Sequence, residues 1–285
     1  MNNEYLNKKE LLDERLTYLI QDVLPESNPL REVMAYGVAT PGKRIRGVLT
    51  MAFCERLNVP KEQAIPFALA LELIHAYSLV HDDMPEMDND DYRRGALTCH
   101  KKYGSAMALL AGDGILNFSV EYLLSNKELY QPDRFLNALS ALYCAAGSKG
   151  MLYGQVLDKM GETRNLMLNE LLELHHAKTG QLLLAPIMIA QALANKQNSD
   201  YVNYSKNIGL AFQIKDDILD VEGTSEELGK EIGKDNDDNK STFVSILGLE
   251  KAKDYLSKEI SEARDAAQED EFLLWLADYI ANRNK

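Results

Sequence analysis

Apolar residues recur at helical spacing along almost the whole chain. In the segment 65–76, Ile65, Leu69, Leu73 and Ala76 follow one another at intervals of three or four residues, which is the spacing of one helix face. The sequence contains no alternating runs of four or more residues bounded by Asn-Gly or Asp-Gly, so strand signals are nearly missing. The pattern therefore predicts an all-α protein.

Helix breakers divide this pattern into about ten predicted helices. The breaks fall at residues 25–29, 41–42, 58–60, 85–95, 131–132, 161–163, 195–200 and 223–239. Apart from 223–239, none is long or polar enough to be an interdomain linker, and no period of about 20–50 residues repeats. We therefore expect a single domain over residues 1–285.

Composition narrows the class of protein. The chain is 46% hydrophobic and carries a formal charge of −13, which fits a compact globule. A negative field repels nucleic acids and anionic membranes, so neither is expected as a partner. Any anionic substrate must be bound by local cations.

Cysteine usage and hydropathy predict a soluble cytoplasmic protein. Cys54, Cys99 and Cys144 show neither disulfide nor zinc spacing. The segment 1–16 is charged where a signal peptide is apolar, and the longest apolar run, 182–190, falls short of the roughly 20 residues of a membrane helix.

A dense acidic cluster follows the apolar helix that ends near residue 81. Pro85 disfavours helical geometry at Met84, so the carboxylates lie at or just beyond a helix carboxyl end, where the helix dipole opposes negative charge. A bound divalent cation would remove that penalty, and carboxylate oxygens suit magnesium. The other reading is a solvated acidic loop. The cluster comprises Asp82, Asp83, Glu86, Asp88, Asp90 and Asp91.

A second cluster favours the metal site. Asp216 and Asp220 are four residues apart on a helical pattern and share a face with Gln213, and Gly223 is expected to end that helix. An EF-hand is a poor match, because the sixth and twelfth positions counted from Asp88 are not glycine and glutamate. A metal phosphohydrolase using the dipeptide 81–82 would leave the second cluster unexplained.

Basic residues lie beside both clusters, as a diphosphate ligand requires. Each taken alone reads as a solvated surface residue, but together they favour a common anion site. His75, seven residues before Asp82, shares its helix face, although a lone histidine on such a face is usually core. The basic and polar candidates are Lys43, Arg44, Arg46, Arg93, Arg94, Lys178, Thr179, Lys230 and Lys240.

These motifs resemble the trans-prenyl diphosphate synthases. DDMPEMD followed by RRG, at 82–95, resembles the first aspartate-rich motif of that family, and DDILD at 216–220 resembles the second. GKRIR, AGDGIL, KTG and FQIKDD occur in the family's order, so the resemblance runs from Pro41 to the carboxyl terminus. Pro85 and Glu86 within the first motif are similar to the bacterial farnesyl diphosphate synthase pattern.

The resemblance implies an isoprenoid synthase fold, a helical bundle around a central cavity, in a homodimer. It implies three Mg²⁺ ions held by Asp82, Asp83, Asp88, Asp216 and Asp220. The allylic diphosphate would contact Arg93, Lys178, Thr179, Gln213, Lys230 and Lys240, of which Lys178, Thr179, Gln213 and Lys230 would be catalytic. Isopentenyl diphosphate would bind Lys43, Arg46, His75 and Arg94.

The implied reaction condenses isopentenyl diphosphate with dimethylallyl and geranyl diphosphate to give farnesyl diphosphate. Tyr77 and Ser78 would set the chain length, with a bulky ring at 77 favouring a short product. Alternatives are a geranylgeranyl or geranyl diphosphate synthase, a terpene cyclase, or a non-catalytic partner subunit. Gly47, Leu97 and Tyr153 depart from the family pattern, and we expect the backbone at Gly47 to be looser than usual.

Overall fold

The predicted all-α class is confirmed. The computed structural model describes residues 2–222 and 241–283, and these are helical apart from connecting turns and one small hairpin. They divide into two compact units: an amino-terminal unit of Asn3–Ala138 with Ala192–Asn195, and a carboxyl-terminal unit of Leu139–Gln191 with the described residues from Lys196 onward. That both units form one functional domain stays a prediction.

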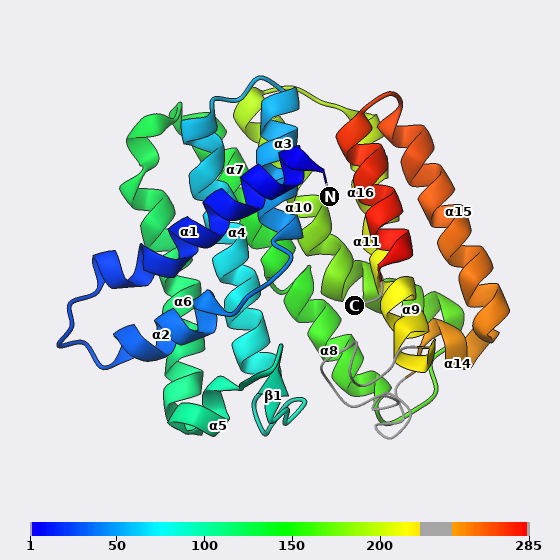
Figure 1. Ribbon diagram of the computed structural model, residues 1–285, viewed down its shortest axis with the longest axis horizontal. Helices are drawn as coiled ribbons and strands as arrows, with labels where there is room; N and C mark the ends of the chain where they lie inside the picture. The colour runs from blue at the N-terminus through cyan, green and yellow to red at the C-terminus, as the bar shows by residue number, and fades with distance from the viewer. Residues whose placement is uncertain (1, 223–240, 284–285) are drawn as a thin grey trace. The chain divides into compact units, whose positions relative to one another are not determined.

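The amino-terminal unit is built around one apolar helix, α4 (Lys61–Asp82), against which α1, α2, α3 and α6 pack (Figure 1). Nearly every residue of α4 from Phe67 to Ser78 is buried. The other elements of this unit are α1 (Asn3–Val23), α2 (Leu30–Ala39), α3 (Ile45–Arg56), β1 (Tyr92–Arg93), β2 (Ala96–Leu97), α5 (Cys99–Tyr103), α6 (Ser105–Ser125), η1 (Lys127–Leu129) and the start of α7 (Pro132–Ala146).

Two helices of this unit are long and apolar enough to cross a membrane by length and composition alone. The most apolar window of α4 has a mean hydropathy of 1.4 and is 78% buried within the protein, as expected of a core helix. The corresponding window of α6 has a mean hydropathy of 1.3 but is only 39% buried. Helix α6 therefore presents apolar side chains at the surface of this chain.

The predicted end of α4 is confirmed. The helix stops at Asp82, three residues before Pro85, and the acidic segment beyond it leads into the antiparallel pair β1–β2. At the tip of this pair Arg94 and Gly95 both adopt positive φ, 55° and 80°, which is the geometry of a tight hairpin turn. The hairpin returns Arg93 toward the end of α4.

The carboxyl-terminal unit is organised around α11 (Ser199–Glu222), which carries the second acidic cluster near its carboxyl end, as predicted. Helices α15 and α16 and the short π-helix η2 pack on α11. Breaks at residues 104, 147–150 and 248 divide runs that the sequence pattern left continuous. The remaining elements are α8 (Met151–Gly161), α9 (Leu168–His175), η2 (His176–Gly180), α10 (Gln181–Ala194), α14 (Phe243–Leu247), α15 (Leu249–Ala267) and α16 (Glu271–Asn282).

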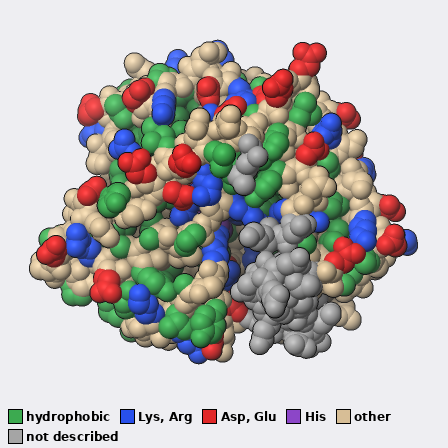
Figure 2. All heavy atoms as spheres, in the orientation of Figure 1, with side chains coloured by type: hydrophobic (Ala, Val, Ile, Leu, Met, Phe, Trp, Pro, Cys, Tyr) green, Lys and Arg blue, Asp and Glu red, His purple; other side chains and the backbone are tan. Residues whose placement is uncertain are grey.

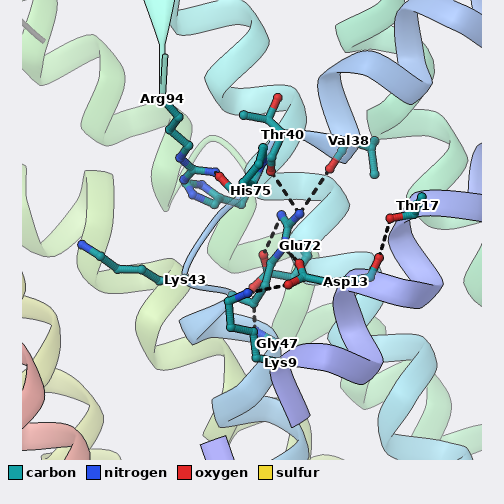
Figure 3. A network of polar contacts seen from close by, with 12 residues as sticks. Lys9, Asp13, Thr17, Val38, Thr40, Lys43, Gly47, Glu72, His75 and Arg94 are labelled. Carbon is teal, nitrogen blue, oxygen red and sulfur yellow. Dashed lines mark hydrogen bonds and ion pairs between the residues drawn. The ribbon is translucent and has the colours of Figure 1, made fainter. Parts of the chain in front are cut away.

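A buried ion network fixes the turn that precedes α3 (Figure 3). Arg44, with φ of 51°, donates from Nε to Asp13 Oδ1 at 2.8 Å and from Nη2 to the Thr40 carbonyl at 3.0 Å. Its Nη1 lies 3.7 Å from Glu72 Oε2. Arg44 is therefore a structural cation, engaged by partners within the protein.

The backbone at Gly47 is held, contrary to our expectation that it would be loose. Its N–H donates to Glu72 Oε1 at 2.8 Å, a bond that a proline at this position would lack. A Cβ at Gly47 would approach a methyl group of Leu12 to 2.8 Å, so α1 packs closely here. The departure from the family pattern is thus accommodated by Glu72 and by close helix packing.

We expect Glu72→Ala to lower the free energy of unfolding by about 3 kcal/mol, because it leaves Arg44 and the Gly47 N–H short of a buried partner. Urea denaturation measures this. The control is Glu55→Ala, which removes an ion pair to Lys8 from a side chain that is 67% exposed. That change should cost less than about 1 kcal/mol. Equal losses in the two variants would contradict a structural role for Glu72.

Candidate active site

The first acidic cluster carries its own counter-ion. Asp83, the residue that follows α4, is 4% exposed, and Arg93 donates to its Oδ1 at 2.5 Å. Arg93 also donates to Asp90 at 3.1 Å. Burial raises the pKa of Asp83 to about 6 despite the opposing effect of Arg93. A predicted metal ligand and a predicted diphosphate ligand therefore lie in direct contact.

The backbone brings the other two predicted metal ligands of this cluster, Asp82 and Asp88, into one turn. The Asp88 N–H donates to the Asp82 carbonyl at 2.9 Å, and the Met87 and Asn89 N–H groups donate to the Met84 carbonyl at 2.9 and 3.0 Å. Asp82 and Asp88 are both partly exposed. Their backbone positions are fixed while their carboxylates remain accessible to a ligand.

The residues predicted to bind isopentenyl diphosphate cluster in the amino-terminal unit. The half-buried His75 has its pKa lowered well below 6.5, by burial and by the charges of Arg46, Arg94 and Arg44. Figure 3 shows His75 and Arg94 together, with Lys43 extending away from the ion network. The same charges that keep His75 neutral would attract an anion.

The Pro-Gly turn shapes this cationic cluster. Arg94 donates to the Pro41 carbonyl at 2.7 Å, and a Cβ at Gly42 would lie 2.6 Å from Arg94 Nη1. A cavity of about 30 Å³ lies behind, bounded in part by His75 and Arg94. It has room for about one water and not for a diphosphate, so an anion would bind at the outer face of the cluster.

In the carboxyl-terminal unit, the π-helix η2 presents two of the predicted catalytic residues. Lys178 donates to Asp158 of α8 at 2.5 Å, and Thr179 donates to Gln213 Oε1 of α11 at 2.6 Å. A π-turn within a helix is uncommon and frequently marks a functional site. A Cβ at Gly154 would collide with the backbone of Lys178, so this glycine lets α8 and η2 approach closely.

The aspartates of the second cluster lie in different environments: Asp217 and Asp220 are buried, and Asp216 is partly exposed. Asp217 is buried, accepts a hydrogen bond from the Phe243 N–H at 2.7 Å and lies 3.6 Å from His175 Nε2, so it anchors the start of α14. Asp216 lies on another face of α11, where Arg283 donates to its Oδ1 at 2.6 Å. Asp216 and Asp220 are one turn apart, as the sequence pattern predicts.

Sequence reasoning missed the counter-ions of these residues. Asp158 pairs with Lys178, 20 residues away in the sequence. Arg283 pairs with Asp216 across 67 residues, and Glu72 pairs with Arg44 across 28. No local pattern signals such distant pairs. Two predicted ligands, Lys230 and Lys240, lie outside the described residues.

A second cavity, of about 600 Å³, lies among α1, α3 and α4 and contains none of the candidate site residues. Its charged side chains are Lys8, Lys61, Glu10, Glu14 and Glu55, so both signs are present and acids outnumber bases. Such a lining does not suit a diphosphate, although the volume matches a small-molecule site. Elsewhere, acidic and basic side chains are intermingled over the face drawn in Figure 2.

The carboxylates of the candidate site are suitable ligands for magnesium. Within residues 2–222 and 241–283, no three acidic, histidine or cysteine side chains already converge as a complete cation site. Magnesium commonly uses only one or two protein carboxylates and completes its shell with water and substrate phosphates. Partly exposed Asp82, Asp88 and Asp216 provide such carboxylates.

Comparison with known proteins defines the class. The polyprenyl synthetase family model matches residues 27–274, so the chain belongs to the polyprenyl synthetase family, as its motifs predicted. The sequence is 42% identical to a farnesyl diphosphate synthase of Micrococcus luteus, over 100% of this chain and 98% of that protein. It is 37% identical to a geranylgeranyl diphosphate synthase of Cyanophora paradoxa, over 97% and 94% of the two chains.

Solved structures show the same fold. The structure of an FPP/GFPP synthase from Zymomonas mobilis superimposes with a TM-score of 0.85 at 33% identity, covering 97% of this chain and 98% of that one. A geranyltransferase from Helicobacter pylori, complexed with magnesium and isoprenyl diphosphate, gives a TM-score of 0.80 at 29% identity over 99% and 97%. Both are enzymes of isoprenyl diphosphate chemistry.

We expect the stability of the protein to fall below pH 6.5 in part because of His75. In the unfolded chain His75 takes up a proton near pH 6.5, whereas in the folded protein its pKa is well below that value. Each pH unit below 6.5 therefore lowers the free energy of unfolding by up to about 1.4 kcal/mol until the folded histidine is protonated too. Asp83 acts oppositely between pH 3.8 and about 6, because its folded pKa is raised. Comparing urea denaturation of wild type and His75→Gln at pH 7 and pH 5.5 isolates His75. The variant should lose less stability, and parallel losses would contradict the assignment.

We expect Gly154→Ala to destabilise the protein by about 2 kcal/mol or more, because the new methyl group meets the backbone of Lys178 and backbone cannot move aside cheaply. Gly161→Ala is the matched control on the same helix, since its methyl group would meet only a side-chain atom of Leu166 at 3.1 Å. That variant should stay within about 1 kcal/mol of wild type. Thermal unfolding measures both, and equal effects would contradict the close approach of α8 to η2.

Proposed function

We propose that this protein condenses isopentenyl diphosphate with dimethylallyl diphosphate and then with geranyl diphosphate to make farnesyl diphosphate. The observation that carries the proposal is a pair of acidic clusters at two helix carboxyl ends, each beside cations, in a chain of the polyprenyl synthetase family. Sequence identity of 42% to a farnesyl diphosphate synthase over the full chain supports the product.

We assign the allylic diphosphate to the two acidic clusters and their adjacent cations. Asp82, Asp83 and Asp88, with Asp216 and Asp220, would hold Mg²⁺, for which we propose a count of three. Arg93 would exchange its bond to Asp83 for a phosphate oxygen when the cation binds there. Lys178, Thr179 and Gln213 would bind and orient the same diphosphate, together with Lys230 and Lys240.

Lys43, Arg46, His75 and Arg94 would hold isopentenyl diphosphate. Three of these side chains are cations. Burial, together with the charges of Arg46 and Arg94, lowers the pKa of His75 well below 6.5, so it would contribute a hydrogen bond rather than a charge. Guanidinium groups bind phosphate oxygens in bidentate geometry, which fixes the orientation of the substrate. This arrangement leaves the isoprenoid double bond, rather than the diphosphate, to react.

The reaction needs no protein nucleophile. When bound, magnesium neutralises charge on the departing diphosphate. Lys178 would stabilise the same charge once its ammonium leaves Asp158 for a phosphate oxygen. The allylic carbon–oxygen bond then breaks, and its electron pair leaves with the diphosphate. The double bond of isopentenyl diphosphate forms the new carbon–carbon bond to the allylic cation, and a proton is lost, in our proposal to the released diphosphate.

Tyr77 is the proposed limit on product length. Its ring lies on α4, five residues before Asp82, is 4% exposed and makes an edge contact with the His81 ring at 5.8 Å. Ser78 is also buried and donates to the His75 carbonyl at 2.9 Å, so its hydroxyl is engaged. A large, fixed ring favours a C15 product, while the geranylgeranyl diphosphate synthase among the relatives keeps C20 as the second candidate.

We also propose a cytoplasmic homodimer. Helix α6 exposes Leu109, Leu110 and Leu124 by 46%, 49% and 48%, and Leu136 of α7 is 60% exposed in the same unit. Several large apolar side chains exposed on one unit are a feature of protein–protein interfaces. The three cysteines are unpaired, which fits a reducing compartment. Sedimentation of the purified chain measures the oligomeric state.

The test of the function is product analysis after incubation with isopentenyl and dimethylallyl diphosphates, with magnesium and with a chelator. Wild type should make a C15 diphosphate only with magnesium. Tyr77→Ala should lengthen the product to C20 or beyond, because it removes the ring, whereas Tyr77→Phe should keep C15. A wild-type C20 product would refute the chain length, and no condensation in either condition would refute the reaction.

A further inference from the structure

The carboxyl terminus of the chain is tied to the second acidic cluster. Arg283 follows α16, and its Nη2 donates to Asp216 Oδ1 at 2.6 Å and to the Phe212 carbonyl at 2.8 Å. Its guanidinium carbon also lies 4.0 Å from the centre of the Phe212 ring. One guanidinium therefore spans a single turn of α11 by an ion pair, a backbone hydrogen bond and a cation–π contact.

This contact differs from the other ion pairs of the same region in its burial. The Arg283 side chain is 3% exposed, while that of Asp216 is 43% exposed. The Arg264–Asp278 pair between α15 and α16 is 45% and 50% exposed. A buried guanidinium requires an anion beside it, so Arg283 depends on Asp216 far more than Arg264 depends on its partner.

We propose that Arg283 is a positioning residue that serves as the resident counter-ion of Asp216 and competes with the divalent cation for that carboxylate. The inference rests on the proposed function, which assigns Asp216 to magnesium. It adds a role for Arg283 and α16. Helix α16 is held against α11 while Arg283 is bonded to Asp216 Oδ1, and a cation that binds Asp216 weakens this attachment.

The direction of the effect follows from charge. A guanidinium and a divalent cation on one carboxylate repel each other, and each must share an oxygen that it otherwise has alone. Because Asp216 is nearly half exposed, its carboxylate is open to a cation from solvent. Removing Arg283 should therefore tighten cation binding, although it also loosens the carboxyl terminus. A purely structural arginine would loosen the terminus without changing cation affinity.

The test is a titration of the full-length protein with Mn²⁺ alone, with unbound Mn²⁺ counted by electron paramagnetic resonance. We expect Arg283→Gln to bind Mn²⁺ about threefold to fivefold more tightly than wild type, the effect of one partly exposed ion pair. Arg264→Gln, which removes an arginine–aspartate pair of α16 away from the cluster, should leave the Kd unchanged. Asp216→Asn should weaken binding.

The outcomes separate this inference from the function on which it rests. If Arg283→Gln binds Mn²⁺ no more tightly than wild type, or if Arg264→Gln also binds it more tightly, the inference about Arg283 is wrong. Weakened Mn²⁺ binding by Asp216→Asn would still support Asp216 as a metal ligand. If Asp216→Asn binds Mn²⁺ with the wild-type Kd, Asp216 is not a metal ligand. Both its metal assignment and the inference about Arg283 are then wrong.

A second readout follows the terminus directly. Trp275, the single tryptophan of the chain, lies on α16 and stacks on Tyr279 with ring centres 5.2 Å apart. Mg²⁺ should change the fluorescence of Trp275 in the wild-type protein. Arg283→Lys keeps the charge but loses the planar fork, so it should hold Asp216 less firmly. The fluorescence change in this variant should therefore be smaller and should occur at a lower Mg²⁺ concentration. If Arg283→Gln does not fold, this variant decides, and a response identical to wild type overturns the inference.

Discussion

A charge that is partly withdrawn from water needs an opposite charge beside it, and this constraint runs through both units of the protein. Asp83 is paired with Arg93, Lys178 with Asp158, and Asp216 with Arg283. The first pair joins two candidate-site residues, and each of the other two joins a candidate-site residue to a partner outside the predicted set. Because a charge withdrawn from water is costly when it lies alone, each partner stabilises the folded position of the residue with which it pairs.

The same pairs explain how a strongly acidic protein can bind a polyanion. Arg93 and Lys178 each already contact a carboxylate, so under the proposed function a diphosphate with its metal ions would exchange partners with them without creating an isolated charge. The carboxylate would then bind the metal ion, and the cation would bind a phosphate oxygen. This exchange keeps the number of opposite-charge contacts nearly constant, so little is lost in desolvation when the ligand binds.

Close backbone approaches hold these groups in place. Gly154 admits the π-helix that carries Lys178 and Thr179, Gly42 admits Arg94 beside the Pro41 carbonyl, and Gly47 uses its N–H to hold Glu72. These charged groups are therefore carried by, or bonded to, backbone that is closely packed. Precise placement of a few side chains requires such rigid support.

The sequence by itself determined the helical class, the helix ends that carry the two acidic clusters, and the family. Those features depend on local periodicity, on breakers such as Pro85, and on motifs read within a few residues. Only the tertiary structure decided which opposite charge each of these side chains contacts. Nothing local distinguishes Arg44, buried against Asp13 and Glu72, from Arg46 two residues later, or predicts that Arg283 reaches Asp216 across 67 residues. Such pairs form only when distant helices pack, because burial, and not sequence proximity, creates the need for a partner.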